Sequence, residues 1–139
     1  MKKVIVLLLM LGSIVISAEI KWQKEYAVAL KSAQQQKKPL LFIISNHNCR
    51  YCVQLEKTTL KDQKVVQKVN NSFVSSLVYV DENPLFPRDL YVGGTPAIWF
   101  IAGNGEPMFE PLMGAIDPVT FMKALEIVGT EHKKTLAKK

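Results

Sequence analysis

The feature that most constrains the fold is an apolar run that is followed, after a short polar segment, by two cysteines. Residues 40–44 read LLFII, residues 45–48 read SNHN and residues 49–52 read CRYC. A short continuous apolar run is typical of a strand buried on both faces of a sheet. The spacing of apolar residues over 49–60 indicates a helix. The sequence therefore predicts a buried strand that leads directly into a helix with both cysteines on its first turn.

The remainder of the chain alternates helical and strand-like patterns. We predict further helices at 22–36, 62–69 and 117–128, and further strands at 73–80, 97–102 and 108–113. A Gly-Asn-Gly turn at 103–105 joins the last two strands as a hairpin, and Gly129 is the predicted stop of the last helix. A parallel strand–helix–strand unit, followed by an antiparallel hairpin and a helix, makes a mixed sheet with helices on both faces. The predicted fold class is therefore α/β.

The two ends of the chain are predicted to lie outside the domain. Residues 1–18 have the layout of a secretory signal peptide: two lysines, a mostly apolar stretch without charge, and a small residue at Ala18, where we expect cleavage. The apolar stretch is shorter than the roughly 20 residues that span a bilayer. Residues 131–139 are rich in charge and lack an apolar period, so we expect a frayed basic tail. One domain remains, over 19–130.

The two cysteines carry the chemistry. Cys49 would stand at a helix N-terminus, where backbone N–H groups and the helix dipole stabilise a thiolate. Cys52 would point back into the fold. These positions suit Cys49 as the nucleophile and Cys52 as the resolving thiol in an exchange that passes through a mixed disulfide.

Other uses of the pair fit less well. Covalent haem attachment needs a histidine directly after the second cysteine, and the sequence has Val53 there. A metal site would need two more ligands, and of the two histidines His47 is near but His132 lies in the predicted tail. A purely structural disulfide stays possible in an oxidising compartment, although so short a loop gains little stability from it.

A second motif, Gly-Gly-Thr-Pro at residues 93–96, stands directly before the apolar strand AIWFI. Proline is tolerated at the first residue of a strand. A cis bond between Thr95 and Pro96 and an ordinary trans turn both fit the sequence at this point.

Together these motifs resemble the thioredoxin superfamily over about residues 20–129. The segment CRYCVQLEKTTLKDQKVV is similar to secreted thioredoxin-like proteins and to the C-terminal thiol-reductase domain of the transmembrane disulfide reductase. The resemblance implies a thioredoxin fold, attack by Cys49, resolution by Cys52 and a cis bond before Pro96. It also implies that Thr95 contacts the substrate backbone.

The residues around the cysteine pair add further expectations. We expect Arg50 and Tyr51, between the two cysteines, to contact substrate. His47 as a cation would favour the Cys49 thiolate, unless it is merely an exposed turn residue.

Two departures from the family pattern matter. Asn48 replaces the tryptophan that often precedes the first cysteine, and Ile43 replaces the buried aspartate of thioredoxin that handles the proton of the second thiol. Glu56, one helical turn beyond Cys52, could take that task. The alternative is that Glu56 is a solvated helix carboxylate paired with a lysine.

The predicted function is thiol–disulfide exchange outside the cytoplasm, by reduction or isomerisation. The expected partners are exported proteins bearing disulfides and a membrane or soluble thiol electron donor. We expect no cofactor and no metal, and a monomeric protein. The net charge is +6, but the basic tail lacks interleaved arginine and aromatic residues, so we expect no nucleic-acid partner. The alternative is a non-catalytic thioredoxin-fold binding module with a structural disulfide.

Overall fold

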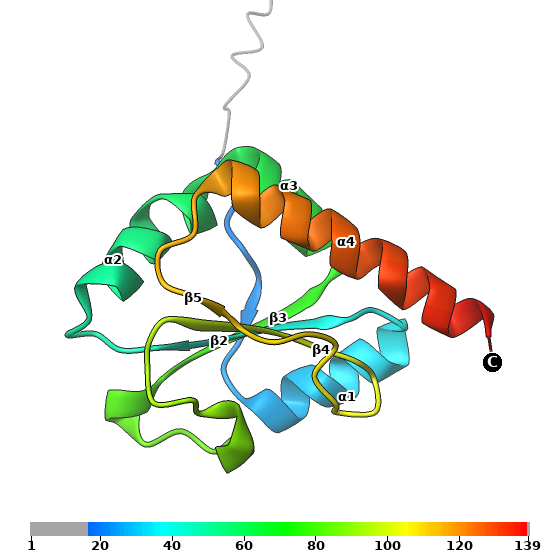
Figure 1. Ribbon diagram of the computed structural model, residues 1–139, viewed down its shortest axis with the longest axis horizontal. Coiled ribbons are helices and arrows are strands. Elements are labelled where there is room, and N and C mark those ends of the chain that lie inside the picture. Colours follow the sequence, from blue (N-terminus) through cyan, green and yellow to red (C-terminus); the bar gives the residue numbers. More distant parts are fainter. Residues whose placement is uncertain (1–16, 139) are drawn as a thin grey trace, which may run out of the picture.

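A mixed five-stranded sheet organises the computed structural model, which describes residues 17–138 (Figure 1). The predicted signal peptide therefore lies almost entirely outside the described residues. The strands run in the order β1-β3-β2-β4-β5: Trp22–Gln23, Val74–Tyr79, Leu40–Ser45, Ala97–Ile101 and Leu112–Met113. The first three strands in this order are parallel, and β4 and β5 are each antiparallel to their neighbour.

Helices cover both faces of the sheet. In Figure 1, α1 lies below the sheet, and α2, α3 and α4 lie above it. Their bounds are Tyr26–Gln36, Arg50–Lys57, Gln63–Ser72 and Pro118–Ala137. The predicted α/β thioredoxin fold, a mixed sheet with helices on both faces, is thus confirmed. None of the helices within residues 17–138 is long and apolar enough to cross a membrane.

Strand β2 is the centre of the fold and positions the cysteine helix. It pairs with β3 on one side and β4 on the other, and all six of its residues are buried. Leu41 and Ile43 pack into the core cluster that faces the upper helices, whereas Leu40, Phe42 and Ile44 pack into the cluster that includes α1. This explains the unbroken apolar run, because neither face of the strand meets water.

The first predicted helix begins later than expected. Trp22 and Gln23 form the edge strand β1, which pairs with β3 through Ser75 and Ser76. Helix α1 begins only at Tyr26. Trp22 fits helical spacing equally well, but pairing with the open edge of β3 satisfies its backbone groups and places the side chain against the core.

The predicted strand at 108–113 is mostly irregular. Only Leu112 and Met113 pair with β4, and Pro107 makes an isolated bridge to Ile101. Pro107 and Pro111 lack the N–H group that a ladder requires, which explains the short strand.

The prediction that the last helix ends at Gly129 and leaves a frayed tail is wrong. Helix α4 continues through Gly129 to Ala137. His132 is buried, and its Nε2 atom lies 3.0 Å from the carbonyl oxygen of Lys37 at the end of α1. Val128 and Leu125, on the same face as His132, are buried too. Glycine in a helix interior is less favourable than alanine by about 1 kcal/mol. The packing of this helix face outweighs that cost.

Candidate active site

Cys49 and Cys52 lie at the N-terminus of α2, and Cys49 is four residues after the end of β2. Cys49 is the N-cap residue, with φ −98° and ψ 117°, and its Sγ atom accepts a hydrogen bond from the Cys52 backbone N–H at 3.2 Å. Both cysteines are free thiols; Cys49 is half-buried and Cys52 is fully buried. The predicted positions of the pair are therefore confirmed: the Cys49 thiol is accessible to another molecule, and the Cys52 thiol is buried.

The environment separates the two thiols chemically. Burial opposes ionisation of Cys49, but hydrogen bonds from the side chains of Cys52 and Thr95 and from the backbone N–H groups of Cys52 and Tyr51 lower its pKa. Burial and the hydrogen bond with Cys49 raise the pKa of Cys52. This difference suits an attacking and a resolving cysteine, respectively. The roles themselves stay predictions.

The loop before β4 closes over the cysteine pair. The Thr95–Pro96 bond is cis, as the family resemblance implied. The carbonyl oxygen of Thr95 accepts a hydrogen bond from the Cys49 thiol at 3.4 Å. Gly94 lies close to the side chain of Met113: a Cβ atom added at Gly94 would lie 3.2 Å from the Cε atom of Met113. Thr95 therefore contacts the candidate nucleophile through its backbone carbonyl. Contact of Thr95 and Pro96 with substrate stays a prediction.

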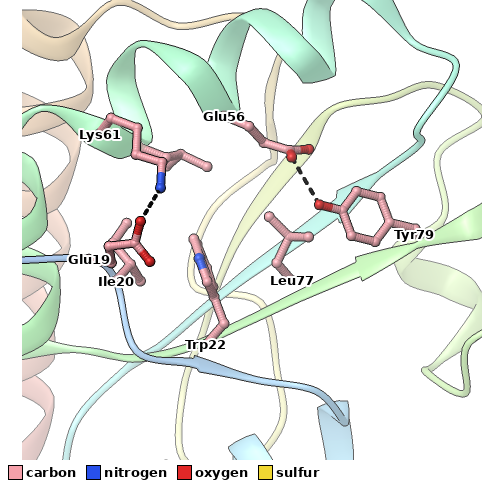
Figure 2. A pocket seen from close by; sticks show the side chains of 8 residues that line it. Glu19, Ile20, Trp22, Glu56, Lys61, Leu77 and Tyr79 are labelled. Atoms are coloured by element: carbon pink, nitrogen blue, oxygen red, sulfur yellow. Dashed lines mark hydrogen bonds and ion pairs between the residues drawn. The ribbon is translucent and has the colours of Figure 1, made fainter.

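Glu56 extends from α2 toward the sheet and is not a freely solvated carboxylate. Its Oε1 atom accepts a hydrogen bond from the Ser45 hydroxyl at 2.6 Å. Its Oε2 atom accepts a hydrogen bond from the Tyr79 hydroxyl at 2.9 Å (Figure 2). Ile43 is buried two residues earlier on the same strand as Ser45. The carboxylate at this site therefore comes from the helix, where thioredoxin would supply it from the strand.

Ser45 and Tyr79 were missed by the sequence analysis. They are direct partners across the parallel pairing of β2 and β3. The sequence offers one signal for Ser45, which is a polar residue at the end of an apolar run. It offers none for Tyr79, which lies in an ordinary strand pattern. Burial, together with the hydrogen bond to Glu56, raises the pKa of Tyr79 to about 12.

His47 has partners other than the one predicted. Its ring stacks on Tyr79, with the ring centroids 3.7 Å apart and the planes 16° from parallel. Its Nδ1 atom lies 2.8 Å from Asp81 Oδ2 and its Nε2 atom 3.6 Å from Glu82 Oε1. The hydrogen bond with Asp81 raises the pKa of His47. Among the hydrogen bonds and ion pairs of residues 17–138, none joins His47 to Cys49, so a tuning role of His47 would act through its charge at a distance.

Arg50 and Tyr51 are exposed beside Cys49. The guanidinium carbon of Arg50 lies 5.2 Å from the centroid of the Tyr51 ring, and Tyr51 is 52% exposed. Substrate contact by these side chains stays a prediction. No group of three metal-ligating side chains occurs within the described part of the chain.

A comparison with models of protein families identifies the family of this chain. The model of the thioredoxin-like domain matches residues 26–129, which is most of the chain. The chain belongs to this family. As a member of the thioredoxin-like family, it carries the Cys-x-x-Cys pair at the helix N-terminus described above.

Solved structures agree with this assignment. A thioredoxin from Thermus thermophilus is 28% identical, with a TM-score of 0.67, over 80% of this chain and 88% of that chain. The DsbH oxidoreductase is 16% identical, with a TM-score of 0.67, over 88% of this chain and 92% of that chain. The C-terminal domain of DsbD from Neisseria meningitidis, in its oxidised form, is 20% identical, with a TM-score of 0.58, over 72% of this chain and 89% of that chain. The last two show the fold alone. A comparison with curated proteins found no match.

Family membership and the geometry of the cysteine pair together support a thiol–disulfide oxidoreductase. The half-buried thiol with its lowered pKa and the buried thiol behind it suit such exchange.

Proposed function

We propose that this protein is an extracytoplasmic thiol–disulfide oxidoreductase that reduces or isomerises disulfides in exported proteins. The observation that carries the proposal is the contrast between the two thiols of α2. Cys49 is half-buried with a lowered pKa, whereas Cys52 is buried with a raised pKa. A structural disulfide would need neither an acidified nor an accessible sulfur.

The reaction proceeds in two exchanges. The Cys49 thiolate attacks one sulfur of a substrate disulfide; the substrate bond breaks, one substrate thiolate leaves and a mixed disulfide forms. Cys52 then loses its proton and attacks the Cys49 sulfur, which releases the second substrate thiolate and forms the Cys49–Cys52 disulfide. Two electrons pass to the substrate, and a membrane or soluble thiol donor restores the reduced pair.

The extracytoplasmic location rests on the signal-like layout of residues 1–18. Thiol–disulfide exchange on exported proteins is consistent with that location, because structural disulfides persist in oxidising compartments.

Trapping tests the function and finds the substrates. In the exported Cys52→Ser variant the second exchange is blocked, so substrates stay bound to Cys49 and can be identified after non-reducing electrophoresis. The matched control is the Cys49→Ser variant, which retains one thiol but should trap nothing. In parallel, the reduced wild-type protein should reduce a model disulfide protein with turnover when a thiol donor is supplied. No turnover, together with a reduction potential below about −300 mV, would support a binding module with a structural disulfide instead.

A further inference from the structure

We propose that the end of the molecule opposite the cysteine pair binds the surface of an anionic phospholipid membrane. This basic end consists of the C-terminal part of α4 and the parts of α1 and α3 that lie beside it. Figure 1 shows the arrangement: the N-terminus of α2 lies at the left of the molecule, and the end of α4 lies at the right. The inference goes beyond the proposed function and depends on it only for the side of a membrane that the protein meets.

The positive charge of the protein is concentrated at the basic end. Its lysines are Lys37, Lys38, Lys68, Lys133, Lys134 and Lys138. Its acidic residues are Glu126 and Glu131, and Glu131 already pairs with Lys134 at 3.5 Å. Glu106, in the turn after β4, lies nearer the start of α1, where its charge acts on Tyr26. The rest of residues 17–138 carries nine basic and ten acidic side chains, so the basic end accounts for the whole positive excess of the described chain.

The lysine side chains of the basic end can reach anionic headgroups. Lys37 and Lys133 are exposed, and Lys38 is half-buried. Within residues 17–138, the ion pairs include none for these three ammonium groups. Each lysine that comes within a Debye length of an anionic membrane strengthens binding about fivefold. Several lysines at one end therefore give reversible binding that salt weakens.

An apolar face of α4 reaches the surface at the same end. Val128 and His132 are buried on one face of the helix, and Leu136 continues that face but is 40% exposed. Figure 1 shows that the end of α4 extends past α1 and the sheet. Two cavities flank this end of the helix; the larger has a volume of about 790 Å³, and its lining includes Ala33 and Ala102. Leu136 can thus enter the interfacial region of a membrane while the lysines around it meet phosphates.

The composition of the basic end favours lipid over a macromolecular partner. Its cations are all lysines, whereas both arginines of the chain, Arg50 and Arg88, lie elsewhere. Protein interfaces are enriched in arginine and aromatic residues and depleted in lysine. Among the described residues, no phenylalanine, tyrosine or tryptophan lines either cavity, which also disfavours single-stranded nucleic acid, because its bases stack on aromatic side chains. A second copy of the chain is disfavoured because two basic ends repel each other.

Binding through the basic end leaves the cysteine pair free. Cys49 is not among the residues that line the two cavities, and the N-terminus of α2 lies at the opposite end of the molecule (Figure 1). The bound protein presents the Cys49 thiol away from the membrane, where exported proteins can meet it.

Vesicle binding tests the proposal without any thiol chemistry. Protein recovered after export from cells that express the full chain is mixed with vesicles of phosphatidylcholine alone, or of equal parts of phosphatidylcholine and phosphatidylglycerol. The fraction that sediments with the vesicles is measured. We expect binding to the anionic vesicles only, and loss of this binding as the salt concentration is raised. The triple variant Lys37→Gln, Lys38→Gln, Lys133→Gln should bind the anionic vesicles roughly 100-fold more weakly.

Matched variants separate this surface from net charge alone. The control triple variant, Lys24→Gln, Lys57→Gln, Lys64→Gln, removes the same charge from lysines that line neither cavity, and its binding should stay within about threefold of wild type. Leu136→Trp places a fluorescent probe at the basic end. After the emission of the native tryptophans is subtracted, its emission should shift to the blue on anionic vesicles. Val119→Trp, at the exposed N-terminal end of the same helix, should show no shift.

Three results would overturn the proposal. Binding to neutral vesicles could equal binding to anionic vesicles, or the two triple variants could weaken binding equally. In the third, polyglutamate at the same concentration of negative charge binds more tightly than the vesicles, and the emission of Leu136→Trp does not shift on the vesicles; the partner would then be an acidic protein. Each of these results leaves thiol exchange untouched, whereas a chain that cells do not export would instead refute the location in the proposed function.

Discussion

Replacing Gly129 with alanine should stabilise the protein, and this tests the course of α4. Gly129 lies inside a 20-residue helix, and a Cβ atom added there meets nothing within 4 Å. Alanine favours a helix interior over glycine by about 0.8–1 kcal/mol, and no contact offsets this gain. The free energy of unfolding should therefore rise by about 1 kcal/mol, which for a domain of this size raises Tm by roughly 3–5 °C. Urea unfolding followed by circular dichroism measures it.

Gly114→Ala is the matched control. A Cβ atom at Gly114 also meets nothing within 4 Å, but its φ of +89° lies in the region that favours glycine. Both substitutions reduce the entropy of the unfolded chain equally, so the difference between them reports the native backbone alone. We expect Gly114→Ala to destabilise by about 1 kcal/mol. If Gly129→Ala were neutral or destabilising, Gly129 would end the helix in solution, and the continuous α4 would be wrong.

Three further predictions follow from the contacts. His132→Ala should lower the free energy of unfolding by about 2 kcal/mol in urea titrations, because a buried side chain and its hydrogen bond to the end of α1 are lost; an unchanged midpoint would contradict that packing. Alkylation of the reduced protein from pH 5 to 9 should label Cys49 first, since its pKa is lowered and that of Cys52 is raised; earlier labelling of Cys52 would reverse their roles. Asp81→Asn should lower the pKa of His47 in an NMR titration. The stability that this pair contributes through His47 is present below the unfolded pKa of histidine and is lost as pH rises through the raised folded pKa, so the variant's loss should fade over that range. It should also fade at low pH, as Asp81 is protonated below its lowered pKa.

Much of the fold was predictable because local patterns and tertiary packing agree there. The run at 40–44 is apolar throughout because β2 is covered on both faces and paired on both edges. Asp62 caps α3, and Asp117 followed by Pro118 begins α4, as local sequence rules predict. The pair of cysteines at a strand-to-helix junction is equally local, which is why their placement could be predicted.

The errors lie where a distant partner decides the outcome. Trp22 joins a strand because β3 leaves an edge open some fifty residues later in the chain. Gly129 stays helical because His132 packs against the end of α1. Neither partner is close in sequence to the residue that it affects. Local propensity therefore favoured a helix at Trp22, and the usual role of glycine at helix ends favoured a stop at Gly129; both predictions were wrong.

The same reasoning explains why Glu56 was within reach of the sequence analysis and its neighbours were not. The spacing of four from Cys52 is a local helical relation, and it places Glu56 on the face of α2 that meets the sheet. Ser45 and Tyr79 become its partners only because β2 and β3 pair in parallel with these two residues in register. A one-residue shift of that register would turn one of the hydroxyls to the other face of the sheet. The register of β2 and β3 thus places two hydroxyls side by side, and together they hold the Glu56 carboxylate of α2 against the sheet.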